Sequence, residues 1–92
     1  MTVKFFATLK LKLGVASVSV DGGQELTVGE AVRRAEETTG RPFWSEIFRE
    51  DGATLPGAMV LLDGANITHL QGVDTPVGEA EAISIFPPAG GG

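Results

Sequence analysis

The residues best suited to chemistry in this chain lie at its C-terminus, which reads Pro87-Pro88-Ala89-Gly90-Gly91-Gly92. Glycine has no Cβ, so a chain that ends in glycine can enter narrow channels that are closed to other residues. The two prolines restrict the backbone and favour a stiff, extended segment ahead of the glycines. The reactive group would then be the main-chain carboxylate of Gly92, presented together with Gly91 to the active site of a partner. The alternative is an inert chain end.

No other set of residues in the sequence offers catalytic chemistry. The chain has no cysteine, which excludes thiol nucleophiles, disulfides and thiolate metal sites. His69 is the only histidine, and a structural or surface role is expected for it. The carboxylates of Glu36-Glu37 and of Glu79 with Glu81 are paired only in sequence, and solvated surfaces explain them. We therefore expect no autonomous active site and no metal site.

Length, charge and hydropathy narrow the class of protein. The chain has 92 residues and a formal net charge of -5, which suits one domain with a modest core. Such an acidic chain is poorly suited to bind nucleic acid or an anionic membrane. No apolar stretch approaches the roughly 20 residues needed to span a bilayer, and no signal-peptide pattern opens the chain. These features predict a cytoplasmic protein.

Two strands are predicted in the first part of the chain. Every odd position from Val3 to Leu13 is apolar, which is the period of a half-buried strand. Since strands rarely exceed about 10 residues, its regular part should end near Leu9 or Lys10. Phe6 breaks the pattern and should point to the face that the lysines occupy. Val18 and Val20 then alternate with serines, which predicts a second strand after a short, hairpin-like connection.

A helix is predicted from Val28 to Thr39. Thr27 and Glu30 form a capping-box pattern at its start, and Gly40 is well placed to end it. The aromatic residues between Phe43 and Arg49 also have helical spacing, and predict a short helical turn that covers one end of the core. The alternative for these aromatics is a stacking platform for bases or a ligand.

The remaining elements are strands and an irregular crossing. Residues 58–62 are apolar on both faces, which predicts a central or doubly covered strand. A short strand is expected at 66–69, an irregular or 3₁₀ segment at 71–77, and a last strand at 82–86. This order indicates an α+β fold in which one mixed sheet of four to five strands wraps around one main helix. We assign residues 1–87 to this domain and 88–92 to a flexible tail.

The sequence resembles a known family in four segments. These are Val3–Ala7, the Val60-Leu61-Leu62-Asp63-Gly64-Ala65-Asn66-Ile67 stretch, Gly72–Val77, and Ile85–Pro88 leading to Gly91-Gly92. They resemble the small ubiquitin-like sulfur carriers, that is, the molybdopterin synthase small subunit and the thiamine sulfur carriers. The resemblance implies a β-grasp fold, in agreement with the order of elements.

The resemblance also implies a mechanism centred on Gly92. An adenylating, E1-like partner would activate the carboxylate with ATP and Mg²⁺, and a sulfur donor would convert it to a thiocarboxylate. A carboxylate with a pKa near 3.5 is ionised at neutral pH and is a poor electrophile, so it needs this activation. The thiocarboxylate then donates sulfur as a nucleophile. The chain itself would bind no cofactor.

Within the family, length favours the molybdopterin synthase small subunit, because thiamine sulfur carriers are shorter and generally lack a segment such as Gly40–Leu55. The implied acceptor enzyme is the molybdopterin synthase large subunit. Sulfur delivery for thiamine, cysteine or tRNA thiolation remains an alternative. So do a ubiquitin-like modifier conjugated to lysines and a non-catalytic β-grasp interaction module.

Two departures from the family pattern affect these expectations. The family tail commonly reads Pro-Pro-Val-Ala-Gly-Gly, and Ala89 and Gly90 replace its valine and alanine. The tail therefore keeps its length but loses an apolar side chain. Before the last strand, Ala80-Glu81-Ala82 stands where Gly-Asp-Glu is frequent, so Gly78 is expected to carry the turn.

A docking surface follows from the strand periodicity. Phe6 and Phe86 fall on the face opposite to Phe5 and Ile85, and the first and last strands of a β-grasp sheet are neighbours. The two rings should form an exposed apolar patch, extended by Met59 or Val60, of the kind that marks interaction sites. With Pro87, Pro88, Ala89 and Gly90 it forms the predicted partner-binding set. The alternative is that residues 43–48 cover the two rings.

Overall fold

The first strand of the fold shows the alternation of buried apolar and exposed polar residues that the sequence predicts. In the computed structural model, which describes residues 1–88, Val3 and Phe5 of β1 (Thr2–Phe5) are buried while Lys4 is exposed. β2 (Ser17–Ser19) pairs antiparallel with β1 along one edge. On the other edge β5 (Ala82–Phe86) pairs parallel with β1. The first and last strands therefore lie side by side, as expected.

The prediction that the first strand continues to Leu9 or Lys10 is wrong. Residues Ala7–Leu13 form a helix, α1, so β1 and β2 are joined through a helix and not by a hairpin-like connection. Among the alternating apolar residues that fall within α1, only Leu9 is fully buried, whereas Leu11 is 81% exposed. Gly14 ends α1 with a left-handed φ of 74°, a conformation that glycine adopts without strain.

Two further strands complete a five-stranded mixed sheet with the order β2-β1-β5-β3-β4. β3 (Met59–Leu62) pairs antiparallel with β5, and β4 (Ala65–Asn66) pairs antiparallel with β3. The prediction of a strand at 66–69 is therefore mostly wrong, because residues Ile67–His69 form the 3₁₀ turn η2. The Asn66 side chain caps this turn by accepting a hydrogen bond from the Thr68 amide. The irregular crossing is confirmed as η3 (Gly72–Asp74), and Gly78 takes a φ of +55° in the turn before β5.

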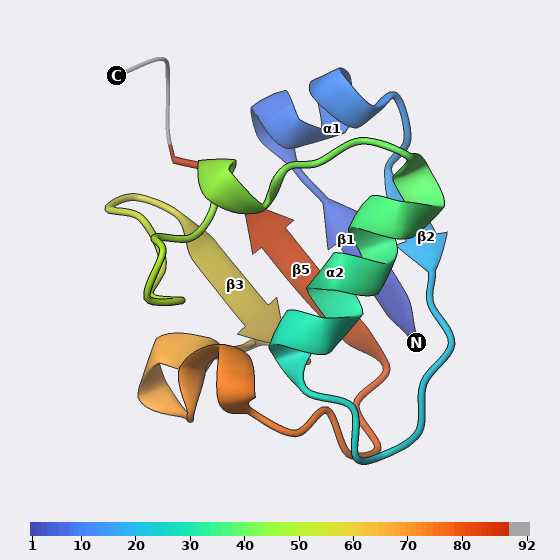
Figure 1. Cartoon of the computed structure of the whole chain (residues 1–92), viewed down its shortest axis with the longest axis vertical. Helices are drawn as coiled ribbons and strands as arrows, with labels where there is room; N and C mark the ends of the chain where they lie inside the picture. The colour runs from blue at the N-terminus through green and yellow to red at the C-terminus, as the bar shows by residue number, and fades with distance from the viewer. Residues whose placement is uncertain (89–92) are drawn as a thin grey trace.

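The long helix α2 (Val28–Thr39) has the predicted bounds and packs across one face of the sheet (Figure 1). Its capping box is formed: the Glu30 amide donates to Thr27 Oγ1, and the Thr27 amide donates to Glu30 Oε1. The Thr27 hydroxyl also donates to Glu30 Oε1, and the hydrogen bonds from the Thr27 amide and hydroxyl to this carboxylate lower the pKa of Glu30. Gly40 ends the helix with a φ of 72°.

The core lies between α2 and the sheet. Phe43, Ile47 and Phe48 are no more than 2% exposed and close one end of it, around the 3₁₀ turn η1 (Trp44–Glu46). The predicted short helical turn is confirmed. Because these side chains are buried in the core, they are not accessible for stacking with a base or a ligand. The buried hydrophobic residues are Val3, Phe5, Leu9, Val20, Leu26, Val28, Ala31, Val32, Ala35, Phe43, Ile47, Phe48, Val60, Ile67, Val77, Ile83 and Ile85.

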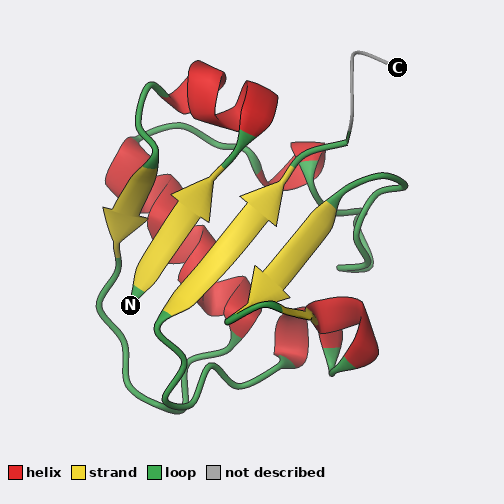
Figure 2. Cartoon of the chain, turned by 180° about the vertical axis from the view of Figure 1, so that it is seen from behind, coloured by secondary structure: helices red, strands yellow, loops and turns green. Residues whose placement is uncertain are grey.

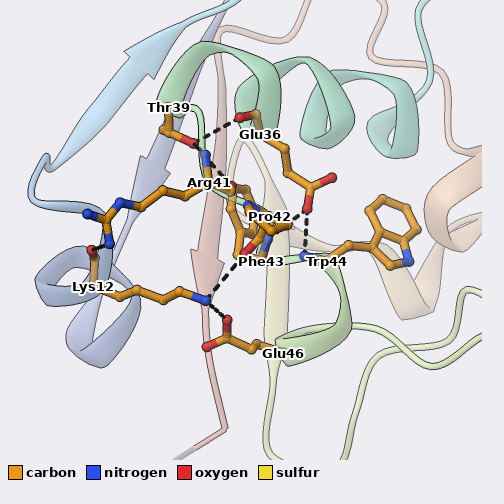
Figure 3. Close-up of polar contacts among 8 residues, drawn as sticks. All are labelled: Lys12, Glu36, Thr39, Arg41, Pro42, Phe43, Trp44 and Glu46. Carbon is orange, nitrogen blue, oxygen red and sulfur yellow. Dashed lines mark hydrogen bonds and ion pairs between the residues drawn. The ribbon is translucent and has the colours of Figure 1, made fainter.

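The carboxylate of Glu36 ties α2 to η1 (Figure 3). Its Oε2 accepts hydrogen bonds from the backbone amides of Phe43 at 2.7 Å and Trp44 at 2.8 Å. Arg33 donates to its Oε1 at 3.0 Å and also stacks over the Trp44 ring at 3.9 Å. The amides at the start of a helical turn have no partner within the turn, so the carboxylate satisfies groups that would otherwise be unpaired.

A second set of contacts ties α1 to the same segment (Figure 3). The Lys12 ammonium pairs with Glu46 and donates to the Pro42 carbonyl oxygen. Arg41 donates in turn to the Lys12 carbonyl oxygen. Segment 40–55 is therefore an integral part of the domain. Within residues 1–88, the chain has no helix of the length and hydropathy required to cross a membrane.

Candidate functional site

Phe6 and Phe86 form a stacked pair at one end of the sheet. Their ring centroids are 4.3 Å apart and their planes differ by 11°. Both side chains are partly exposed, whereas their chain neighbours Phe5 and Ile85 are buried. The Phe6 amide donates to the Ile85 carbonyl oxygen at 3.2 Å, which continues the parallel pairing of β1 with β5. The adjacency predicted from periodicity is confirmed, and the role of the pair in partner binding stays a prediction.

The stack belongs to a sheet face that no helix of residues 1–88 covers (Figure 2). α2 lies behind the sheet, so the strand residues that alternate with the buried ones point outward. The pairing registers place the following residues on this open face: Thr2, Lys4, Ser17, Ser19, Met59, Leu61, Ala82, Ser84 and Phe86. We call this set, together with Phe6, the open face.

Met59 extends the aromatic stack, and Val60 does not. Met59 is opposite Phe86 in the β3–β5 register and is 36% exposed, whereas Val60 is fully buried. The prediction of a central or doubly covered strand is confirmed in its first form, because β5 and β4 flank β3 in the sheet, while no helix of residues 1–88 covers its outward face. Its apolar outward residues, Met59 and Leu61, lie next to β5 on the open face. Leu61 was not anticipated, although its two-residue spacing from Met59 was the available signal.

Segment 43–48 does not cover the two rings, which rules out the alternative interpretation. Phe43 packs edge-on against Phe5 at 5.5 Å, on the core side of β1. Trp44 contacts Phe48 at 4.3 Å, and Arg33 stacks over it. The aromatic residues of the chain thus divide into a core group and an open-face pair. Ring stacking on an exposed surface provides apolar area with a defined shape, which suits protein docking.

The C-terminal tail starts directly at this stack. Pro87 and Pro88 follow Phe86 and are partly buried. The predictions for Ala89, Gly90, Gly91 and Gly92 lie outside the described residues. Within residues 1–88 no cluster of histidine and acidic side chains has the composition of a metal site. The described residues therefore bring together a partly exposed aromatic stack and the start of the tail.

Comparison with known proteins identifies the family. The model of the ThiS family matches residues 3–92, which includes both terminal glycines of the predicted reactive site. The chain belongs to the ThiS family. It is thus a member of the sulfur carriers and ubiquitin-like modifiers that the resemblance indicated.

Individual relatives of this ThiS-family chain support the assignment. Small archaeal modifier protein 3 of Haloferax volcanii is 32% identical over 96 residues, covering 100% of this chain and 98% of its own length. The crystal structure of SAMP1 from Haloferax volcanii has a TM-score of 0.77 at 26% identity, covering 99% of this chain and 97% of that one.

A more distant likeness concerns the fold alone. The crystal structure of the Amycolatopsis orientalis BexX/CysO complex matches with a TM-score of 0.78 at 21% identity, covering 99% of this chain and 98% of that one. Together these matches and the strand order confirm the β-grasp fold.

Proposed function

We propose that this chain is a sulfur carrier in which Gly92 is the reactive residue and Gly91 its required neighbour. The observation that carries the proposal is the ThiS family match, which runs through the terminal glycines. The open face beside the tail supplies a surface on which a partner can dock.

The proposed reaction has two steps on the partner enzyme. The Gly92 carboxylate attacks the α-phosphorus of ATP, pyrophosphate leaves, and the partner's Mg²⁺ balances the phosphate charge. Sulfide from the donor then attacks the acyl carbon of the adenylate, displaces AMP and loses its proton to solvent, leaving a thiocarboxylate. The adenylate is needed because a carboxylate lacks a good leaving group. ATP and Mg²⁺ belong to the adenylating enzyme in this scheme, and the chain holds no cofactor of its own.

For the sulfur acceptor we propose the pterin precursor held by a molybdopterin synthase large subunit. Support comes from the length of the chain and from segment 40–55, which is tied to both α1 and α2 by Lys12, Arg41 and Glu36. Sulfur delivery for thiamine, cysteine or tRNA thiolation uses the same thiocarboxylate and differs only in the acceptor. A cytoplasmic location, where ATP is available to the partner, is part of the proposal.

A second candidate function is protein modification. It is favoured by the full-length similarity to small archaeal modifier protein 3. The same Gly92 adenylate would then be transferred to a lysine ε-amine, forming an isopeptide bond with loss of AMP. The two functions share the activation step and diverge in the nucleophile that follows it.

Intact mass spectrometry separates these functions. The full chain is incubated with the adenylating enzyme of its own genome, ATP, Mg²⁺ and a sulfide donor. Replacement of one oxygen by sulfur is the expected result, and lysine-linked adducts would instead support the modifier. If the mass does not change in the presence of an enzyme that hydrolyses ATP, both proposals fail and the chain is an interaction module.

A further inference from the structure

A hollow of about 490 Å³ opens beside the Phe6–Phe86 stack, between β1, α1 and the start of β2. Lys4 and Lys10 contribute its two charged side chains, and both are exposed. Phe6, Ala7 and Ala16 supply apolar wall. Sequence reasoning had placed Lys10 in the first strand, and the hollow exists because α1 turns away from the sheet after Phe6. Ala7 makes that turn with a φ of +53°.

The charges around the hollow are of one sign. The chain contains 12 acidic residues, yet none is among the residues of the open face, whose single charge is Lys4. Among residues 1–88 the salt bridges are Lys12 with Glu46 and Arg33 with Glu36, and neither involves Lys4 or Lys10. An acidic chain therefore has a surface with two lysines and no acidic residue beside the partly exposed Phe6–Phe86 stack.

Docking on the aromatic stack has a consequence for these lysines. Lys4 is opposite Ser84 in the β1–β5 register. Phe6 follows Lys4 by two residues and Phe86 follows Ser84 by two residues, so the rings and the Lys4 side chain share the open face. A protein surface that covers the rings also takes water from the Lys4 ammonium. Removing an ammonium from water without a partner is unfavourable, so a surface that binds here is expected to supply an anionic group.

We propose that the hollow receives an aspartate or glutamate carboxylate carried on an apolar segment of the adenylating enzyme that acts on Gly92. This inference rests on the proposed function, since it assumes such an enzyme. The apolar walls and the adjoining rings suit a peptide segment with apolar side chains on either side of its acid. The lysine ammonium groups donate hydrogen bonds to the carboxylate and pair with its charge. This charge pairing orients the carrier on the enzyme with its tail towards the active site.

The substitution Lys4→Met tests the inference, because methionine keeps the length of the side chain and removes only its charge. A matched control is Arg49→Met, which removes one positive charge from an exposed residue in the loop after η1, outside the open face. Binding of each full-length variant to the adenylating enzyme is measured by isothermal titration calorimetry at low and high salt. Lys10→Met provides an independent second variant.

We expect Lys4→Met to weaken binding at low salt by about tenfold, Lys10→Met to weaken it measurably, and Arg49→Met to change it less than about twofold. The affinity of Lys4→Met should also depend less on salt than that of the wild type. Equal or tighter binding by Lys4→Met would overturn the inference, because it would mean that an apolar group faces Lys4. Equal losses in Lys4→Met and Arg49→Met would overturn it as well.

Two further measurements separate this inference from the proposed function. Titration of ATP into the carrier alone tests whether the hollow is a nucleotide site, and saturable binding that Lys4→Met abolishes would overturn the inference. Intact mass after incubation with enzyme, ATP and sulfide reports conversion of Gly92. If the wild type binds the enzyme but is not converted, the proposed function fails while the Lys4 comparison still decides the docking chemistry. A wild type that does not bind overturns the inference.

Discussion

At the scale of single residues, Phe6 is a large aromatic side chain that lies outside the core and stays partly exposed. It follows the buried Phe5, stacks on Phe86 at 4.3 Å and contributes no ring to the core. A stacked aromatic pair contributes about 1 kcal/mol beyond its buried area. That contribution is small beside the apolar area the pair offers to a docking protein.

We predict that Phe6→Asp leaves the fold intact but weakens binding to the adenylating enzyme by tenfold or more, roughly the effect of removing an interface anchor. The loss in stability should be about 1 kcal/mol, because only the stack and partial burial are lost. Titration calorimetry and thermal unfolding give the two quantities. Leu11→Asp is the matched control, since Leu11 is 81% exposed on α1 and its substitution should change neither. Unchanged affinity for Phe6→Asp would contradict the prediction.

At the scale of elements, the Glu36 carboxylate ties α2 to segment 40–55 through hydrogen bonds from the Phe43 and Trp44 amides. Burial acts to raise the pKa of this carboxyl, but the hydrogen bonds from the Phe43 and Trp44 amides and from Arg33 outweigh it, so the pKa lies below its ordinary value of 4.5. A group whose pKa is lowered on folding stabilises the folded state above its unfolded pKa. That contribution is lost as the pH falls through the folded pKa.

We therefore predict that Glu36→Gln destabilises the protein by about 1–2 kcal/mol near neutral pH, since an amide keeps one acceptor but not the charge. The difference from the wild type should shrink as the pH falls from about 4.5, the ordinary value that applies to the unfolded chain, through the lower pKa of the folded state, where the wild-type carboxylate becomes protonated. Urea unfolding at a series of pH values measures it. Glu37→Gln, at the exposed neighbouring position, is the control and should show little effect at any pH. A Glu36→Gln deficit that stays constant with pH would contradict the assignment.

At the scale of the whole molecule, the fold and the proposed chemistry occupy separate parts of the chain. Every buried hydrophobic residue that the structure describes lies between Val3 and Ile85. The proposed reactive residue, Gly92, is the last residue of the chain. The last residue of the open face, Phe86, ends β5 and is followed directly by Pro87. A change at the chain end should therefore affect transfer without affecting the domain.

Deletion of Gly92 tests this separation. We predict that the shortened chain unfolds at nearly the same temperature as the wild type. Changes away from the core alter the free energy of unfolding by no more than roughly 0.5 kcal/mol. It should still bind the adenylating enzyme through the open face but form neither an acyl adenylate nor a thiocarboxylate. Thermal unfolding, calorimetry and intact mass provide the three readouts. Formation of a thiocarboxylate on the shortened chain would show that Gly92 is not the specific reactive residue.

Local sequence patterns predicted the elements whose signals are local. The capping box of Thr27 and Glu30, the periodicity of α2 and the glycine at its end depend on residues within a few positions of each other, and the predicted bounds of α2 are those observed. The bounds of β5 were also predicted correctly, because its alternating residues meet a covered and an open face. The terminal glycines stood out from sequence because no other residues offered chemistry.

The tertiary structure decided what depends on contacts between distant residues. Residues 7–13 alternate like a strand, but they form α1, because the core takes only Leu9 while Lys12 and Arg41 tie the segment to residues 40–55. The register of β3 against β5 decided that Met59, and not Val60, joins the open face. The turn into α1 placed Lys10 beside Lys4 and created the hollow. A two-residue period is compatible with either face and with more than one element, and only packing selects among them.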